Sequence, residues 1–490
     1  MSRFVSTRSG AFCVDSKNAM IRGLAPDGGL YAPVEIPKLD YKMLKGLSYS
    51  ELAARIVHTW FDDLGWEEIV ESCAEAYGKH FDTPLVAPVV KAADTYIVEL
   101  FHGETCAFKD VALSLLPRLL VKSRSAIGLS EKVLILTATS GDTGSAAMNG
   151  FKNVPDTGMI TFFPNGGVSP LQRRQMVCID APNVTACAVN GNFDDCQSAV
   201  KRAFAELPKI DGISFSSANS INIARLVPQI GYYYSTYLTL LQTGEIREGE
   251  TISFVVPTGN FGDILAGCYA KRMGLPIGRL ICASNANNVL TDFINTGVYD
   301  RRRDFLKTLS PSMDILISSN LERLIYYAQD EDSALVSRQM EELKTKGIYS
   351  VSSDTLSRIR KDFSAYCFDD AETIDTIRSF YNETGYLADP HTAVALSAQR
   401  RYVKENPGEK CAVLSTASPF KFVSCIAEAL NVTDSGDPFD TMRRISDKTG
   451  LKAPEYLSAL ESRDEKHKDT IDRGDIIDYV LGKYPALFRL

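Results

Sequence analysis

The chain has 490 residues, which is too long for one hydrophobic core, so we expect two or three domains. Hydrophobic residues make up 45% of it and charged residues 23%, as in ordinary soluble globular proteins, and no apolar run is long enough to span a membrane. The formal net charge of −8 excludes a nucleic-acid surface built on bulk positive charge. The first residues lack the apolar core of a signal peptide, and we expect a cytoplasmic protein with neither a membrane nor a nucleic-acid partner.

The 11 cysteines are scattered along the chain and include no C-x-x-C pair. Cys178, Cys187 and Cys196 are evenly spaced, but no histidine accompanies them, so we expect no metal site. Free buried thiols fit the expected compartment.

Residues 1–94 are expected to form a small helical N-terminal domain. A turn-rich stretch at 23–31 is followed, from about Ser50 to Tyr77, by apolar residues at helical spacing.

From Thr95 onward, short β-branched runs alternate with helices. We expect strands at 96–101, 133–138, 159–163, 184–189, 252–257 and 280–284, and helices at 111–123, 144–151, 194–207 and 264–273. This alternation predicts an α/β fold of two βαβ domains with mainly parallel sheets, whose ligands bind at the carboxyl ends of the strands. The charged segments at about 295–380 and 434–490 are expected to be a helical insertion and a helical C-terminal tail.

One lysine, Lys109, follows the strand at 96–101 and a turn that contains Gly103. A lysine placed there can be held partly desolvated, which lowers its pKa and makes its amine a nucleophile for an aldehyde. A pyridoxal-phosphate enzyme requires such a lysine. Because most lysines are solvated, this interpretation depends on the segments downstream.

Two turns between a buried strand and a helix are candidates for binding anions. The first, residues 139–144, reads Thr-Ser-Gly-Asp-Thr-Gly, and the second, residues 258–263, reads Thr-Gly-Asn-Phe-Gly-Asp. Backbone N–H groups at a helix N-terminus favour an anion, and two glycines three residues apart let the second turn approach a compact phosphate closely. Taken singly, each turn also fits an ordinary loop with a helix cap. Together they favour a cofactor phosphate and a second anionic group.

Two more segments carry polar groups suited to such ligands. The run 216–225 is rich in short hydrogen-bond donors and ends at Arg225, whose planar guanidinium suits a phosphate or a carboxylate, although a helix cap with a surface arginine gives the same pattern. The late strand that starts at Val413 ends in hydroxyls, and a hydroxyl can hydrogen-bond a pyridine nitrogen without forcing its protonation.

Several short motifs follow one another along nearly the whole chain: residues 26–31, 102–110, 139–147, 190–195, 219–229, 259–263 and 389–393. In this order they resemble the threonine synthase family, in the longer branch found in fungi and many bacteria. That family lies within the tryptophan-synthase-β-like class of pyridoxal-phosphate enzymes of fold type II.

The resemblance implies a role for each candidate residue. Lys109 would carry the cofactor, pyridoxal 5'-phosphate, and act as the catalytic base. The cofactor-binding residues would be Lys109, Gly259, Asn260, Phe261, Gly262, Asp263 and Thr416, with Thr416 at the pyridine nitrogen. The substrate's α-carboxylate would meet Ser140, Gly141, Asp142 and Thr143, and its phosphate would meet Asn219, Ser220 and Arg225.

The resemblance also implies a domain plan. Residues 95–129 and 226–490 would form a large cofactor-binding domain, including the insertion and the tail. Residues 130–225 would form a small, mobile substrate-binding domain.

One segment departs from the family's pattern. Where the family usually reads Ser-Thr-Ala-His-Pro-Ala-Lys-Phe, this chain has Ser418 for the histidine and Phe420 for the alanine, while Thr416 and Lys421 match. The cofactor contact is still expected, but no role for a histidine at that position carries over.

By the same resemblance we expect a carbon-oxygen lyase that acts on phosphates, as a monomer or homodimer. It would convert O-phospho-L-homoserine and water to L-threonine and phosphate by γ-elimination and β-addition, in threonine biosynthesis. Two alternatives stay open: a phospho-lyase that releases 2-oxobutyrate from the same substrate, and a non-catalytic paralogue that binds a metabolite.

Overall fold

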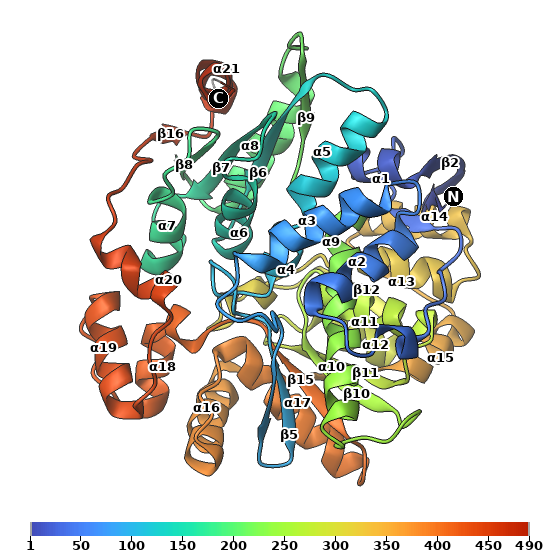
Figure 1. The fold of residues 1–490 in the computed structure, drawn as a ribbon, viewed down its shortest axis with the longest axis vertical. Coiled ribbons are helices and arrows are strands. Elements are labelled where there is room, and N and C mark those ends of the chain that lie inside the picture. The colour runs from blue at the N-terminus through green and yellow to red at the C-terminus, as the bar shows by residue number, and fades with distance from the viewer. Residues whose placement is uncertain (1, 489–490) are drawn as a thin grey trace.

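The computed structural model describes residues 2–488, and two parallel sheets organise it (Figure 1). The larger sheet has the strand order β14-β11-β10-β15-β5-β4 and the smaller one β16-β8-β7-β6-β9. All neighbouring strands in both sheets are parallel except β4 and β5. The structure therefore confirms the predicted α/β fold with mainly parallel sheets.

The strands of the larger sheet are β4 (Val89–Ala92), β5 (Thr95–Glu99), β10 (Ile252–Pro257), β11 (Ile277–Ser284), β14 (Phe363–Cys367) and β15 (Cys411–Ser415). Every residue of β10 and β15 is buried, as expected for central parallel strands that helices cover on both faces. The helices packed around this sheet and its connections are α4 (Lys109–Leu113), α5 (Leu116–Ala126), α9 (Ile223–Leu226), α10 (Ile230–Gln242), α11 (Gly262–Met273), α12 (Val289–Thr296), α13 (Leu321–Ala328), α14 (Ser333–Thr345), α15 (Ser353–Asp362), α16 (Asp370–Thr384), α17 (Pro390–Glu405) and α18 (Val423–Leu430).

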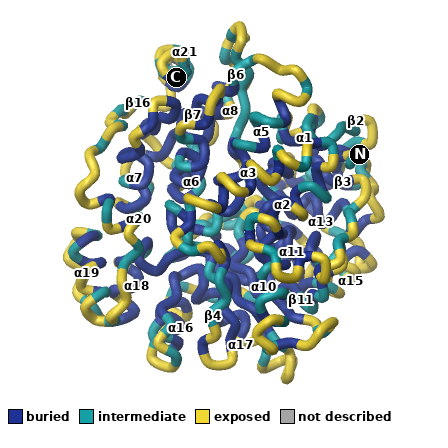
Figure 2. Tube along the Cα trace, viewed as in Figure 1, coloured by how far each residue is buried: buried dark blue, intermediate teal, exposed yellow. Residues whose placement is uncertain are grey.

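The smaller sheet consists of β6 (Lys132–Ala138), β7 (Thr157–Pro164), β8 (Val184–Asn190), β9 (Ile213–Ser216) and β16 (Thr470–Asp472). Its helices are α6 (Asp142–Phe151), α7 (Pro170–Val177), α8 (Phe193–Glu206) and α21 (Ile476–Leu487). Figure 2 shows that buried residues concentrate along the strands and the inner helices, whereas exposed ones lie on the outer turns.

The N-terminal region contains more strand than the sequence predicts. Helices α1 (Ser16–Arg22), α2 (Tyr49–Trp60) and α3 (Trp66–Gly78) accompany an antiparallel sheet of β1 (Arg3–Ser6), β2 (Ser9–Asp15) and β3 (Tyr31–Pro33). Helix α2 begins where expected, because Ser48 and Glu51 form a capping box at its start. β1 and β3 have only four and three residues, and β2 has no buried residue, so the alternation of apolar and polar residues gives little signal.

The segment expected to be a helical insertion also contains strands. β12 (Val298–Asp300) and β13 (Ile348–Ser350) pair with each other, and β14 forms the edge of the larger sheet beside β11. The insertion is therefore not purely helical, and it contributes the edge strand of the larger sheet.

The C-terminal tail packs differently from the predicted domain plan. After α19 (Pro438–Thr449) and α20 (Glu455–Ser458), the chain crosses to the smaller sheet, where β16 pairs with β8 (Figure 1). Ile476, Val480 and Leu487 of α21 share an apolar cluster with Leu134 and Ile160 of the smaller sheet. β16 has only three residues and lies in a charged stretch, so its sequence has no periodicity from which its pairing with β8 could be predicted. Among residues 2–488, no helix is long and apolar enough to cross a membrane.

Candidate active site

The predicted site residues gather where strands of both sheets end. Lys109 follows β5, Thr416 follows β15, Gly259 follows β10, and Asp142 follows β6. In the larger sheet β10, β15 and β5 are neighbours, so their carboxyl ends meet at one edge.

Lys109 is the first residue of α4, and its side chain is 11% exposed. Its Nζ donates to Asp142 Oδ2 at 3.4 Å and to Ser312 Oγ at 3.3 Å. Burial lowers the pKa of Lys109 below its ordinary value, and the charges of Lys421 and Arg225 lower it further, against the opposing effect of Asp142. The amine is therefore in the partly desolvated setting that the sequence predicts.

Asp142, the first residue of α6, is the centre of a buried ion network. Its Oδ1 accepts from Lys421 Nζ and from Gln172 Nε2, both at 2.9 Å, and its Oδ2 accepts from Ser312 Oγ at 2.9 Å. Burial alone would raise the pKa of Asp142, but Lys421 and Lys109 hold it well below its ordinary value. Both carboxylate oxygens of Asp142 accept hydrogen bonds within this network. An ionised carboxylate has no proton to donate, so the Asp142 side chain cannot bind an anionic substrate group.

The turn around Asp142 still presents backbone donors. Thr139 Oγ1 accepts from the N–H groups of Gly141 at 3.0 Å and Gly144 at 2.8 Å, which fixes the turn. Gly141 has φ of 134°, and a side chain there would collide with Gln172. The N–H groups of Asp142 and Thr143 begin α6 and have no intrahelical partner, so they can meet an anion beside the exposed Ser140.

The second turn lies against the segment that contains Ser312. A Cβ added to Gly259 would come within 2.6 Å of the Ser312 carbonyl oxygen, so only glycine fits. Asn320 N donates to Asn260 O at 3.1 Å, and Phe261 adopts a left-handed φ of 60°. This backbone directs the first N–H groups of α11, which starts at Gly262, toward the turn.

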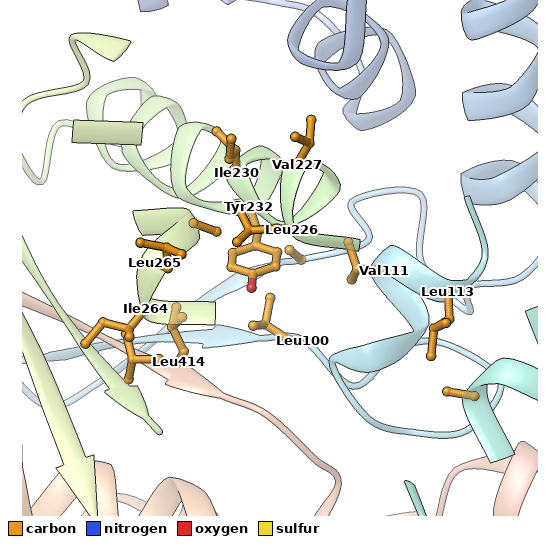
Figure 3. Packing of buried hydrophobic residues seen from close by; sticks show 14 of the residues in the cluster. Leu100, Val111, Leu113, Leu226, Val227, Ile230, Tyr232, Ile264, Leu265 and Leu414 are labelled. Atoms are coloured by element: carbon orange, nitrogen blue, oxygen red, sulfur yellow. The ribbon is translucent and has the colours of Figure 1, made fainter. Parts of the chain in front are cut away.

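Asp263 turns its side chain into the protein rather than toward a bound anion. Its Oδ1 accepts from Tyr232 Oη at 2.5 Å and Tyr233 Oη at 3.0 Å, while Oδ2 is buried with no partner among residues 2–488. Figure 3 shows Tyr232 among the apolar side chains that pack α10 against α4 and α11. Burial raises the pKa of Asp263 to about 6. Asp263 can therefore contribute only its backbone N–H group to an anion site at the start of α11.

Arg225 is a buried cation that pairs with no carboxylate among residues 2–488. It is 4% exposed, its Nη1 donates to Ala218 O at 2.9 Å, and no partner of its Nε occurs in the described part of the chain. Burial lowers the pKa of Arg225 to about 10. Of its predicted companions, Asn219 is exposed, and the Ser220 carbonyl accepts from Asn320 Nδ2 at 3.2 Å. An uncompensated buried guanidinium is suited to a phosphate.

Thr416 and Ser418 lie on a short extended segment that runs beside the chain leading to Lys109. Phe108 N donates to Thr416 O at 2.8 Å, and Ser418 N donates to Cys106 O at 3.0 Å. Ser418 is 1% exposed, and its Oγ has no hydrogen-bond partner within residues 2–488. Main-chain hydrogen bonds therefore hold this segment beside the residues that immediately precede Lys109.

Sequence reasoning did not predict the role of several residues of the site. Lys421 was noted only as a match to the family's motif, and its sequence context does not indicate that it is fully buried and paired with Asp142. Nothing near Ser312 indicates its contact with Lys109. His391 Nε2 accepts from Ser312 N at 3.1 Å, so its Nδ1 carries the proton and donates to Asp389 Oδ1 at 2.7 Å. The sequence motif at 389–393 contains both Asp389 and His391, but it does not indicate their contact with Ser312.

Three family models match the chain: threonine synthase N terminus over residues 3–77, pyridoxal-phosphate dependent enzyme over residues 80–417, and threonine synthase C-terminal over residues 392–476. The threonine synthase of Pseudomonas aeruginosa is 39% identical over 436 residues, which cover 87% of this chain and 90% of that protein. Threonine synthase-like 1 of Macaca fascicularis is also 39% identical, over 92% of this chain, but the chain spans only 62% of the length of that relative.

The solved structures agree with these matches. A threonine synthase from Brucella melitensis, crystallised with pyridoxal phosphate bound, superposes with a TM-score of 0.88 and 38% identity, over 99% of this chain and 100% of that one. The yeast threonine synthase superposes with the same TM-score and 34% identity, over 99% of both chains.

Proposed function

This chain belongs to the threonine synthase family of pyridoxal-phosphate dependent enzymes, and on that premise we propose that it converts O-phospho-L-homoserine and water to L-threonine and phosphate. One observation carries the proposal: the amine of Lys109, whose pKa is lowered, lies among separate groups of anion donors. One of these is the buried Arg225, whose Nε has no hydrogen-bond partner in the described residues. A substrate with both a carboxylate and a phosphate, together with a cofactor phosphate, needs three such groups.

The residues present fit the cofactor. The turn at 259–263 keeps its shape only with glycine at 259, because a Cβ there would collide with the Ser312 carbonyl, and the α11 N-terminus supplies N–H donors. Thr416 and Ser418 belong to a segment that is hydrogen-bonded to the chain just before Lys109. We propose that the turn at 259–263 binds the cofactor phosphate and that Thr416 meets the pyridine nitrogen. When bound, pyridoxal phosphate supplies an electron sink that acidifies the substrate's Cα–H and Cβ–H bonds.

The proposed work of the protein is binding and proton transfer. The N–H groups of Asp142 and Thr143 hold the α-carboxylate, and Arg225 holds the phosphate and stabilises its charge as it leaves. Lys109 Nζ removes the Cα proton, a role that its lowered pKa favours. Asp142 keeps Lys109 oriented, and Lys421 holds Asp142 ionised.

The proposal is tested by comparing O-phospho-L-homoserine with L-homoserine as substrates. Threonine should form only from the phosphorylated compound, because Arg225 would otherwise have no anion to bind and the hydroxyl is a poor leaving group. Lys109→Ala should abolish turnover and the covalent attachment of the cofactor, read by mass after borohydride reduction. Lys122→Ala is the matched control, since that lysine is a surface residue paired with Glu71. Full activity in Lys109→Ala would refute the assignment.

A further inference from the structure

A cavity of about 160 Å³ lies next to the active site, between α6, α7 and the tail segment after α20. In Figure 1 these elements lie side by side. A single water needs roughly 10–15 Å³ of such volume, so this cavity accommodates a small molecule. None of the roles proposed for the reaction uses it.

The cavity has one buried polar atom without a partner and one cation at its exposed side. Gln175 is 4% exposed, its Nε2 donates to Thr105 O at 2.9 Å, and its Oε1 is buried without a partner in residues 2–488. Arg463, an exposed residue of the tail, lines the cavity from the solvent side. A buried acceptor and a solvent-facing cation are therefore available to a ligand that enters the cavity.

The other charged groups of the wall are already paired. Glu104 accepts from Lys152, and its Oε1 lies 2.7 Å from His80 Nδ1. Lys152 also donates to Asn149 Oδ1 at 3.3 Å. The net requirement is a molecule with one anionic group for Arg463 and one hydrogen-bond donor for Gln175 Oε1.

The pairing of Glu104 with Lys152 lets the wall accept an ammonium group as a donor. The carboxylate offsets the positive charge of Lys152, and Tyr456, whose pKa is raised by burial and then by Glu104, lies close to the same carboxylate. An ammonium group and a carboxylate on one small molecule describe a free α-amino acid. The volume restricts it to one with a small side chain.

We propose that this cavity is a second ligand site, which binds a small free α-amino acid through its carboxylate at Arg463 and its ammonium at Gln175 Oε1. Occupation of the cavity is linked to the active site by one carbonyl: Thr105 O accepts from Gln175 and also from Lys421 Nζ, at 2.7 Å. Lys421 in turn pairs with Asp142. The ligand therefore acts on the network that orients Lys109, whichever product the active site releases.

The test is calorimetric titration of the holoenzyme with glycine, L-alanine and L-serine, and with propionate, which lacks the ammonium. At least one amino acid should bind without changing the absorbance of the bound cofactor, which separates this event from binding at the active site. Propionate should bind at least ten-fold more weakly.

Arg463→Ala should weaken this event ten-fold or more, whereas Arg443→Ala should not change it. Arg443 is the matched control because it is a surface arginine paired with Glu461, away from the cavity. Absence of such an event for all three amino acids would overturn the proposal. Equal affinity in the two variants, or propionate binding as tightly as the amino acids, would overturn it too.

Discussion

At the scale of single residues, the site is a concentration of buried positive charge. Lys109, Lys421 and Arg225 lie near one another, and Asp142 is the only carboxylate to which the described structure ties Lys109 and Lys421 by ion pairs. A buried charge without full compensation costs several kcal/mol, so such an excess is typical of a site that binds anions. The proposed substrate and cofactor both carry phosphate and supply the missing charge.

Arg225→Met should lower kcat/KM for O-phospho-L-homoserine by about 10²–10³-fold, because the group that stabilises the leaving phosphate is lost while the side-chain volume is kept. Steady-state kinetics measures this. Arg247→Met, which changes an exposed arginine, should remain within two-fold of the unchanged protein. Equal losses in both variants would remove Arg225 from the mechanism.

Asp263 gives the protein a specific dependence of stability on pH. Its folded pKa of about 6 is above the ordinary value of 3.8, so the folded state binds more protons between these two values and the free energy of unfolding falls as pH rises through them. Asp263→Asn should remove this pH-dependent loss. The free energy of unfolding of the variant, minus that of the unchanged protein, should therefore increase by about 2–3 kcal/mol between pH 4 and pH 7. Urea unfolding at several pH values measures the difference.

The matched control for this experiment is Asp211→Asn, at an exposed position. That variant should follow the unchanged protein at every pH. An Asp263→Asn variant that also did so would show that the buried carboxylate does not titrate in this range.

The residues that sequence reasoning found share one property, which is a local pattern. Lys109, the turn at 259–263 and Arg225 each stand at the end of an apolar strand or a donor-rich run. Ser312 and Gln172 have no such pattern, because their roles come from contacts with residues more than 25 positions away. Asp142 was found in the right turn, but its pairing with Lys421 depends on the fold and could not be predicted.

At the scale of elements, prediction succeeded where a strand is long and buried. β6, β10 and β11 each have at least six residues and contain a continuous apolar run, and all were expected. β12, β13 and β16 have three residues each, too few for periodicity to appear. The helix expected at 111–123 is divided into α4 and α5, with Ser114 and Leu115 between them.

The turn before α11 gives an element-scale prediction with an internal control. Gly259→Ala forces the turn away from the Ser312 carbonyl, because the added Cβ would lie only 2.6 Å from a main-chain oxygen. The dissociation constant for pyridoxal phosphate should rise ten-fold or more. Gly262→Ala meets only the Asn320 side chain, at 3.5 Å, and should change it less than three-fold. Fluorescence titration of the cofactor-free variants measures both dissociation constants. Equal constants would contradict the proposed role of Gly259 in the cofactor-phosphate turn.

At the scale of the whole molecule, the tail ties the C-terminus to the smaller sheet. β16 extends that sheet beside β8, and Arg173 of α7 pairs with Glu465 just before it. We propose that the smaller sheet moves as a unit with the tail, which modifies the domain plan predicted from the sequence. Any such movement would carry Asp142 toward or away from Lys109, because Asp142 belongs to α6 of the smaller sheet.

Ile476→Ala should lower the free energy of unfolding by about 2–4 kcal/mol, since this fully buried side chain packs α21 against the smaller sheet. Asp478→Ala, on the exposed face of the same helix, should lower it by less than about 0.5 kcal/mol. Denaturant unfolding measures the free energy of unfolding of both variants. Similar stabilities would mean that α21 does not stabilise the sheet.

The most direct test of the proposed reaction is to incubate the purified holoenzyme with O-phospho-L-homoserine and to quantify phosphate, threonine and 2-oxobutyrate in the same samples. We predict one threonine for each phosphate released, with no 2-oxobutyrate above the Lys109→Ala background. Phosphate accompanied by an equal amount of 2-oxobutyrate would contradict the synthase reaction and show a phospho-lyase, and no phosphate at all would show a protein that only binds its ligand.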